Sequence, residues 1–412
     1  MTDQNFTTEA APAATPYEML ETHAREAIQT LLQRMLEEEV EVLLGRGRYE
    51  RGQPPQGRPV YRNGYGKPRR VAFTAGTIEV RRPRVVGLEE PFESQVLPLF
   101  KRRTSELGAM LPELYLHGLA QRDFELALRG LLGPGAPLSA SSIGRLKEQW
   151  VAEYDAWRAQ PLAGELVYLW ADGIYVKAGL EKEKAALLVL IGAFSDGTKR
   201  ILAVEAGYRE STESWLEVLR SIGRRGLEAP RLVIADSALG LWAAIAELGW
   251  KCAEQRCWNH KLTNVLDALP KNAQKEAQPM LRAIPAALTK EEAVQRRNEF
   301  VQAFKGRHAK ACKRLQDDWE RMVSFYSFPQ EHWKHLRTSN VVESPFHAVR
   351  LRTSAAKRYQ KTPNAEAMIW KLLMVAERTF RKLNAPHLLP FVAQGAVYAN
   401  GVLLKKGRNT AA

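Results

Sequence analysis

The stretch ELVYLWADGIYV, residues 165–176, decides the fold of the central part of this chain. Two further apolar stretches follow it closely, KAALLVLIGAF (184–194) and KRILAVEAG (199–207), and later come RLVIAD (231–236) and WKCAEQR (250–256). Short apolar runs bounded by turn-forming residues are typical of buried strands. Helical patterns separate the later runs. Three strands in succession, then helices and strands in alternation, predict an α/β domain with a mixed sheet and helices on its faces.

Three acids stand at informative places in this pattern. Asp172 follows the apolar run LVYLW, and Asp236 ends the predicted strand RLVIA. Glu343 lies in TSNVVESPFHAVRLRTSAAKR, a predicted helix that turns basic after the acid. Hard divalent cations such as magnesium prefer oxygen ligands, and two such ions can hold both reacting oxygens of a phosphodiester exchange. Two strand-end aspartates and a helical glutamate therefore suggest a metal site that acts on phosphodiester bonds.

Each acid also has a plainer interpretation. Asp172 before Gly173 could form a turn, and Asp236 could cap the helix that follows it. Asn340 and Glu343 have the spacing of a capping box, so Glu343 could serve only to start a helix. The joint order of the three acids along a mixed fold, in a basic chain, favours the metal site.

The charge of the chain indicates a polyanionic partner. Its 412 residues carry a net charge of +14, and the isoelectric point is about 9.6. Residues 1–50 carry a net charge of −6, whereas residues 51–103 carry +8 and residues 344–412 carry +10. This asymmetry predicts two anion-facing surfaces that flank a more neutral middle.

The length of the chain predicts two or three domains. A polar start is expected to be disordered, and a helix with one apolar stripe follows it. The next region is rich in Gly, Pro and Arg, and VAFTAGTIEVRRPRVV within it alternates like a short hairpin. We expect the following order: a disordered N-terminus (1–16), a helix and basic region (17–103), a helical DNA-binding unit (104–160), the first part of the core (161–256), a helical insertion (257–332), the second part of the core (333–383) and a basic tail (384–412).

The unit over residues 104–160 resembles a helix-turn-helix, because a Gly/Pro turn separates two of its three predicted helices. A mainly helical DNA-binding region at the N-terminal end is therefore expected, although many three-helix units look alike. For the arginine-rich residues 45–100, a merely solvated arginine surface is the competing interpretation. Candidate DNA contacts are Arg62, Arg69, Arg70, Arg145, Lys147, Arg350, Arg352, Lys357 and Arg358.

The location of the protein is predicted from what the sequence contains. Three cysteines are too few for a disulfide framework and fit a reducing cytoplasm. We see no secretory signal at the start and no apolar run of roughly 20 residues. A cytoplasmic, nucleoid-associated protein with no membrane partner is expected.

The core motifs, in order, resemble those of bacterial insertion-sequence transposases of the mutator type. The segments are RNGYGKPRRVAFTAGTIEVRRPRVVG, ADGIYVK, VIADSALGLWAAI, QRCWNHKLTNV and TSNVVESPFHAVRLRT, and the resemblance runs from about residue 17 to residue 380. It implies a ribonuclease-H-like core with a DDE triad of Asp172, Asp236 and Glu343. It also implies two Mg²⁺ ions, which Mn²⁺ can replace, and binding to the double-stranded terminal inverted repeats and to target DNA. A homodimer or larger assembly would then hold two DNA ends. Pro345 departs from the family pattern, because an aliphatic residue is more common there.

Cys257 and His260 match a Cys-x-x-His pair that follows the second acid in this family. Zinc normally takes four ligands, and no second pair is evident, so we expect an auxiliary role beside the active site. Two alternatives to a transposase stay open at this point. One is a ribonuclease-H-like nuclease that cuts without joining, and the other is a non-catalytic DNA-binding regulator.

Overall fold

A computed structural model describes residues 16–50, 60–73, 76–98, 114, 116, 140–176, 185–207, 209–236, 239–356 and 362–405. The chain forms two compact units, residues 1–146 and 147–412, which we describe separately. The expected disordered N-terminus lies outside the described residues, except that Pro16 begins the first helix. Most of the expected helix-turn-helix unit also lies outside them. No helix in the described part of the chain is long and apolar enough to cross a membrane.

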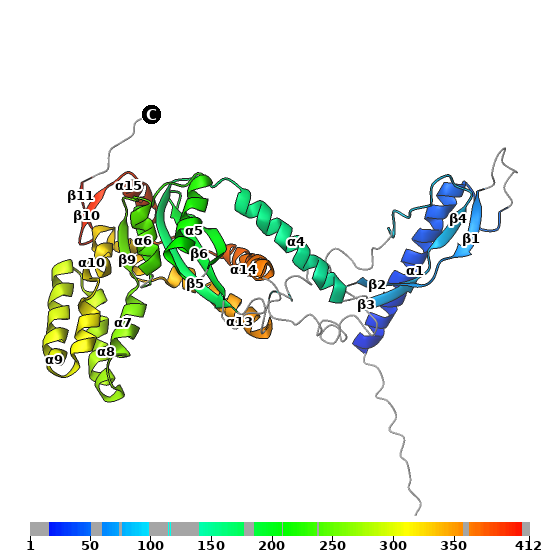
Figure 1. The fold of residues 1–412 in the computed structure, drawn as a ribbon. Helices are drawn as coiled ribbons and strands as arrows, with labels where there is room; N and C mark the ends of the chain where they lie inside the picture. Colours follow the sequence, from blue (N-terminus) through cyan, green and yellow to red (C-terminus); the bar gives the residue numbers. More distant parts are fainter. Residues whose placement is uncertain are drawn as a thin grey trace, which may run out of the picture. The chain divides into compact units, whose positions relative to one another are not determined.

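In the described part of the first unit, one long helix accompanies four short strands (Figure 1). Helix α1 (Pro16–Leu44) packs against β3 (Gly76–Val80), which pairs in antiparallel fashion with β2 (Arg69–Phe73). This β2–β3 hairpin confirms the predicted one. Strands β1 (Tyr61–Tyr65) and β4 (Pro83–Val86) form a second antiparallel pair, so the described part of this region is less helical than expected.

A small core holds the first unit together. It consists of Leu36, Val71, Ile78, Val80 and Leu97, each at most 3% exposed. The side chains of β3 alternate between buried and more exposed positions, which helps to make the hairpin visible in the sequence, whereas β2 buries the consecutive residues Val71 and Ala72. Strand β1 buries none of its residues, so its pairing with β4 leaves no such alternation.

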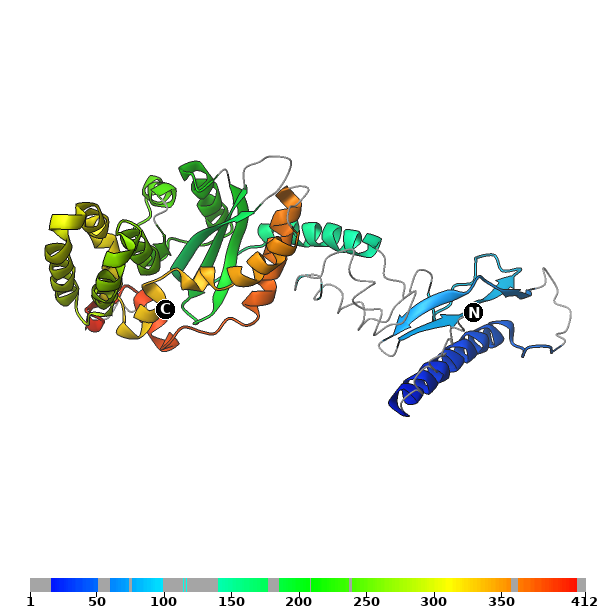
Figure 2. The ribbon, with the colours of Figure 1, turned by 90° about the horizontal axis from the view of Figure 1, so that it is seen from below.

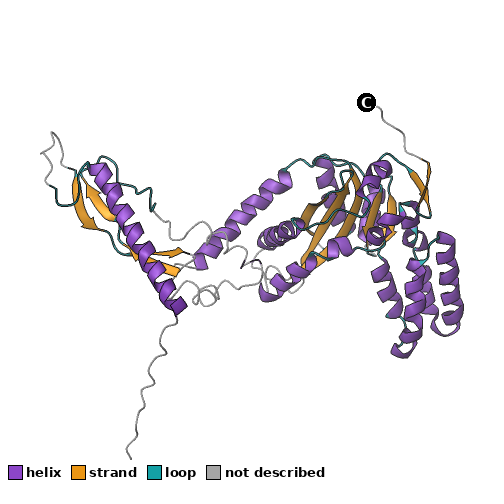
Figure 3. Ribbon diagram, turned by 180° about the vertical axis from the view of Figure 1, so that it is seen from behind, coloured by secondary structure: helices purple, strands orange, loops and turns teal. Residues whose placement is uncertain are grey.

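The second unit is built on a five-stranded mixed sheet with the order β7-β6-β5-β8-β9. Strands β5 (Leu166–Val176), β6 (Ala185–Phe194) and β7 (Lys199–Gly207) are antiparallel, whereas β8 (Leu232–Ala235) and β9 (Ala253–Arg256) extend the sheet in parallel with β5. The predicted α/β class and mixed sheet are confirmed. Helices surround the sheet in Figure 3.

One face of this sheet packs against helices α5 (Thr212–Arg224) and α6 (Leu239–Glu247). Alternate strand residues such as Leu169 and Ala171 point into this core, where they meet Trp215 of α5. The Ser211 hydroxyl caps α5 by accepting a hydrogen bond from the Ser214 backbone N–H at 3.3 Å.

The opposite face is covered by chain segments from beyond residue 320. Tyr168 Oη lies 2.8 Å from His332 Nδ1, and Trp170 Nε1 donates to the His335 carbonyl. Helix α14 (Thr362–Glu377) runs beside the edge strand β7, as Figure 2 shows. Two of its glutamates accept hydrogen bonds from backbone N–H groups of β7 and thereby cover an edge that would otherwise expose unpaired donors.

The segment expected to be a helical insertion is helical in the structure. It contains α7 (Trp258–Leu266), α8 (Lys271–Ala286), α9 (Lys290–Gln316), α10 (Trp319–Met322), η1 (Ser324–Ser327) and η2 (Gln330–His332). The chain then returns to the sheet through α11 (Trp333–Leu336), α12 (Asn340–Glu343) and α13 (Phe346–Ala356).

Helices and strands form both ends of the described part of the second unit. Helix α4 (Ala140–Ala159) leads into it, and the hydroxyl of its buried residue Tyr154 donates to the Val204 carbonyl at 2.6 Å. The expected basic tail begins with η3 (Pro386–Leu388) and α15 (Leu389–Ala393). A hairpin of β10 (Val397–Ala399) and β11 (Val402–Lys405) follows. The part of the tail up to residue 405 is therefore folded.

Candidate active site

Two aspartates stand side by side at the end of a parallel ladder. Strands β5 and β8 pair in parallel up to Ala171 and Ala235, and Asp172 and Asp236 are the next residues along each chain. The expectation that Asp172 ends its strand is wrong, because β5 continues to Val176. Strand β5 extends beyond the end of β8 because it remains paired with its antiparallel neighbour β6. Only the parallel pairing with β8 ends here, with Ala171 as its last residue on β5.

Glu343 reaches the same face of the sheet from α12. This helix packs against β5 and β6, and the buried Ser339 hydroxyl donates a short hydrogen bond to Glu343 Oε1. The capping-box interpretation does not hold, because the described contacts of the Glu343 carboxylate do not include the Asn340 backbone. The side chain of Asn340 instead accepts a hydrogen bond from the Asn259 amide at 3.0 Å.

The predicted single helix around Glu343 is divided in two. Helix α12 ends at Glu343 and α13 begins at Phe346, with Pro345 between them. Proline has no N–H to donate and its ring hinders the preceding turn, which explains the break. Glu343 therefore does not share one continuous helix with the basic residues that follow it.

His260 lies between two of the three acids. Its Nδ1 atom is 3.8 Å from Asp236 Oδ1 and 3.8 Å from Glu343 Oε1. Helix α7 positions this side chain, and Cys257, the fully buried cap residue of α7, accepts a hydrogen bond from the Ser339 backbone N–H at 3.3 Å. Cys257 thus ties the start of α7 to the start of α12, so that His260 and Glu343 face each other.

Burial, hydrogen bonds and neighbouring charges shift the pKa values of Asp172 and His260. Burial raises the pKa of Asp172 to about 7, a hydrogen bond from the Gly173 backbone N–H opposes the rise, and the Glu343 and Glu210 carboxylates add to it. A hydrogen bond with the Cys257 side chain raises the pKa of His260 to about 9, against the effect of burial, and Asp236 and Glu343 add to the rise. The site therefore concentrates negative charge beside one cationic imidazole.

Glu210 is a fourth carboxylate that the sequence did not single out. The Tyr175 hydroxyl donates to its Oε1 at 3.0 Å, and Arg209 before it has a left-handed backbone with φ of +58°. Gly173 leaves room for it, since a Cβ atom there would lie 2.5 Å from Glu210 Oε1. Burial raises the pKa of Glu210, and Asp236 adds to the rise. No strand-end position marks this residue, so only the three-dimensional arrangement reveals it.

The donor set fits a divalent cation. Within the described part of the chain, Asp236 Oδ1 is buried without a hydrogen-bond partner, and His260 Nδ1 is in the same position. A buried carboxylate oxygen with no donor is costly unless a cation satisfies it. Ligand atoms of Cys257, His260 and Glu343 also lie within 4.8 Å of one another. The oxygen atoms suit magnesium, whereas the sulfur and imidazole would suit a softer metal.

Three of the predicted DNA contacts lie on strands β1 and β2 of the first unit. Arg62 is engaged internally, with ion pairs to Glu37 at 3.0 Å and to Glu41 at 3.4 Å, and its side chain is only 18% exposed. It is therefore not placed to meet a phosphate. Arg69 contacts the Pro98 carbonyl, and Arg70 is exposed beside Glu79 at 4.0 Å.

The other predicted contacts divide between exposed, buried and undescribed positions. Arg145 and Arg350 are exposed, and Lys147 is half-buried. Arg352 is only 3% exposed, so the expectation of a DNA contact there is wrong. It occupies the side of α13 that packs inward, which the basic run of its sequence does not reveal. Lys357 and Arg358 lie outside the described residues.

Comparison with known proteins identifies the family. Residues 1–383 match the family described as "Transposase, Mutator family". The chain belongs to the Mutator family of transposases. It is 45% identical to the transposase for insertion sequence element IS6120 of Mycolicibacterium smegmatis, over 73% of this chain and 93% of that protein. It is 37% identical to the transposase for IST2 of Acidithiobacillus ferrooxidans, over 67% and 94%.

More distant relatives agree. The transposase for IS256 in transposon Tn4001 of Staphylococcus aureus is 25% identical over 91% of this chain and 95% of that protein. The solved HTLV-2 integrase catalytic core domain in complex with magnesium shares 18% identity and covers 28% of this chain and 84% of its own. Its TM-score of 0.18 is too low to inform the fold. This Mutator-family chain is thus a transposition enzyme that acts on DNA.

Proposed function

We propose that Asp172, Asp236 and Glu343 are the catalytic acids with which this transposase cuts and joins DNA. The observation that carries the proposal is the register of β5 and β8, which sets the two aspartates side by side on the sheet face that α12 covers. Chemistry on phosphodiesters needs converging oxygen ligands for hard cations, and this arrangement supplies them from three separate parts of the chain.

The sheet supports a ribonuclease-H-like core. That fold is expected to begin with three antiparallel strands, followed by a helix, a strand, a helix and a strand. Both later strands should run parallel to the first, as β8 and β9 do. In the proposed core the acids come from the first and fourth strands and from a helix after the insertion.

Asp172, Asp236 and Glu343 would hold Mg²⁺, and Mn²⁺ could replace it. When bound, such ions lower the pKa of an attacking water or 3′-hydroxyl and stabilise the leaving oxygen. The remaining contacts hold the acids in place. The Gly173 N–H fixes Asp172, and the Ser339 hydroxyl fixes Glu343. Residues that hold metal ligands in this way commonly matter for activity.

His260 and Cys257 act as positioning residues in this proposal. Protonated His260 lies at the same distance from Asp236 and Glu343 and offsets part of their repulsion. Cys257 holds the two helices that carry His260 and Glu343. Glu210 adds a fourth carboxylate beside Asp172, at the edge of the site. From this position it would support the metal ligands through water molecules.

The proposed DNA partners are the terminal inverted repeats of the chain's own insertion sequence and a target duplex. Exposed Arg70, Arg145 and Arg350 are the described members of the predicted set that are free to meet phosphate oxygens. A homodimer or larger assembly would bring two ends together. Binding should weaken steeply as salt is added, because phosphate contacts release counterions.

A strand-transfer assay tests the proposed function. The full chain is incubated with Mg²⁺, a pre-cut end of its own insertion sequence that carries a free 3′-hydroxyl, and a target plasmid. Joined products are expected. Cleavage of uncut ends without any joining would indicate a nuclease, and binding without either reaction would indicate a regulator.

A further inference from the structure

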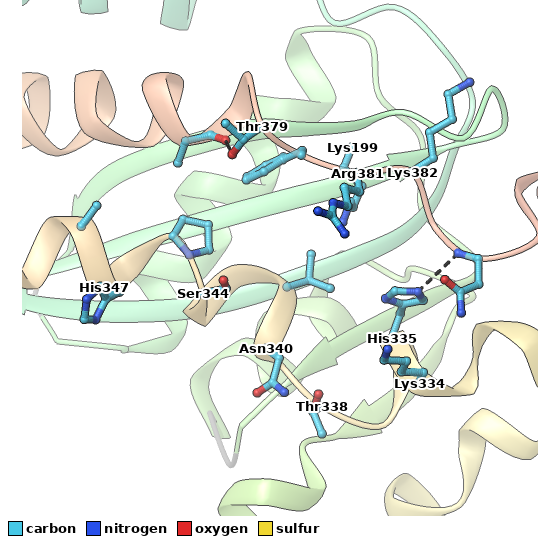
Figure 4. A pocket seen from close by; sticks show the side chains of 16 residues that line it. Lys199, Lys334, His335, Thr338, Asn340, Ser344, His347, Thr379, Arg381 and Lys382 are labelled. Carbon is cyan, nitrogen blue, oxygen red and sulfur yellow. Dashed lines mark hydrogen bonds between the residues drawn. The ribbon is translucent and has the colours of Figure 1, made fainter. Parts of the chain in front are cut away.

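A basic pocket opens beside the proposed catalytic helix. It has a volume of about 680 Å³. Residues of α11, α12 and the start of α13 line it, together with the end of α14, the residues that follow α14, and Lys199 of β7 (Figure 4). Asn340 and Ser344, which line it, stand on either side of Glu343 in the sequence. Asn340 also contacts Asn259, the neighbour of His260. The pocket therefore adjoins the site through α12.

The charge of the pocket is of one sign. Its cationic lining residues are Lys199, Lys334, Arg381 and Lys382, and none of the 16 residues that line it is an acid. Lys334, Arg381 and Lys382 are exposed, whereas Lys199 is half-buried. Several cations in one concave surface focus a positive potential that attracts anions. An anionic ligand is therefore favoured.

The pocket also contains an aromatic ring and a side-chain amide that a ligand could contact. Phe380 lies half-buried in the wall, with the Lys199 ammonium 5.7 Å from its ring centroid. Asn384 is held by a hydrogen bond from its backbone N–H to His335 Nε2 at 3.3 Å, which leaves its side-chain amide available to a ligand. An aromatic ring beside cations is the combination with which proteins bind the bases and phosphates of single strands.

We propose that this pocket binds one unpaired nucleotide of the DNA strand next to the scissile phosphate. A duplex is far too wide to enter a pocket of this volume, whereas one nucleotide displaced from the stack can place its base against Phe380. Its phosphate would meet Lys199 and Arg381. Displacing a nucleotide from the base stack costs a few kcal/mol of free energy, and contacts in a preformed pocket offset that cost. The inference rests on the proposed function, since it makes the pocket part of the DNA path to Glu343.

The test measures binding without catalysis. Two labelled duplexes carry one end of the chain's own insertion sequence in EDTA. One is fully paired, and the other has mismatched, unpaired nucleotides at the cleavage position with the fluorescent base 2-aminopurine among them. The full chain should bind the unpaired end about tenfold more tightly, as expected for one stacked base. Fluorescence of 2-aminopurine should change on binding.

Matched variants assign the effect to the pocket. K199Q combined with R381Q should remove the preference for the unpaired end and keep most of the affinity for the paired one. The control R220Q changes an exposed arginine on α5, paired with Glu247, and should keep the preference. Thermal denaturation confirms that each variant folds.

Three results would overturn the proposal: equal affinity of the unaltered chain for both ends, an equal loss on both ends in the double variant, or an equal effect of R220Q. Because these measurements need no metal, they can fail while the strand-transfer assay succeeds. That combination would reject the pocket alone. Failure of strand transfer with the preference intact would instead reject the proposed chemistry.

Discussion

Asp172 and Asp236 occupy equivalent places in neighbouring parallel strands, each directly after the last pair of their shared ladder, Ala171 and Ala235. Residues opposite each other in parallel strands point to the same face, and both alanines belong to the core under α5 and α6. The two aspartates therefore point to the other face, where α12 brings Glu343. This relationship concentrates negative charge, and several consequences can be measured.

The raised pKa of Asp172 predicts a pH-dependent stability in metal-free protein. A carboxyl group whose pKa rises on folding from 3.8 to about 7 contributes stability at low pH that is lost as the pH rises through this window. Asp172→Asn removes the ionisation, so it should stabilise the protein at pH 8 by roughly 1–2 kcal/mol, after a discount for partial exposure, and much less at pH 5.

Calorimetry in EDTA at both pH values measures this difference. Asp155→Asn, at an exposed position on α4, serves as the control and should change little. A lower Tm of Asp172→Asn at pH 8 would contradict the predicted cost of ionising Asp172 in its buried position.

His260 should also stabilise the metal-free protein more at low pH than at high pH, but in a higher pH window than Asp172. Its pKa rises on folding from 6.5 to about 9, so its contribution is complete below pH 6.5 and disappears as the pH rises through 9. His260→Gln should therefore lower the free energy of unfolding by about 1 kcal/mol at pH 6, discounted for its exposure, and have little effect at pH 10. Urea denaturation at the two pH values measures it, and a pH-independent loss would show that packing alone matters.

Glu210 should support activity without being required for DNA binding. Glu210→Gln keeps the hydrogen bond from Tyr175 but removes a charge beside Asp172. Loss of such a supporting group commonly lowers metal affinity or activity by about 10–100-fold. End cleavage is measured across a Mg²⁺ titration, with Glu217→Gln on the exposed side of α5 as the control. Unchanged rates at limiting Mg²⁺ would remove Glu210 from the site.

The purified protein should hold no stoichiometric zinc after exhaustive dialysis, although Cys257, His260 and Glu343 lie close enough to share an ion. Zinc normally takes four ligands. In the proposed site the Cys257 side chain instead links α7 to α12, and the Glu343 carboxylate is a ligand for magnesium. Elemental analysis decides the point. About one zinc per chain, lost on Cys257→Ser, would show a zinc centre.

Much of this site could be predicted from the sequence because local patterns mark it. The apolar run before Asp236 marks a buried strand, and β3 shows the alternation of a half-buried strand. Other features depend on contacts between distant segments. Because β5 stays paired with β6 beyond Asp172, this residue lies within its strand and not at the strand end. No local sequence pattern indicates this position.

The remaining differences have the same origin. Glu210 lies in a loop, and it gains its place only through Tyr175 and Gly173. A basic run in the sequence cannot show that Arg352 faces inward while Arg350 faces solvent. Arg62 finds its partner Glu37 on α1, which the sequence places far away.

The most direct test of the central claim is end cleavage and joining by Glu343→Gln. Glutamine keeps the shape and can still accept the Ser339 hydrogen bond, but it removes the negative charge that a cation needs. A labelled end of the insertion sequence is assayed with Mg²⁺ and with Mn²⁺, and Glu299→Gln on the exposed side of α9 serves as the control. Glu343→Gln should abolish cleavage and joining in both metals, while repeat binding and Tm stay close to those of the unaltered chain. Cleavage near the unaltered rate in both metals would contradict it.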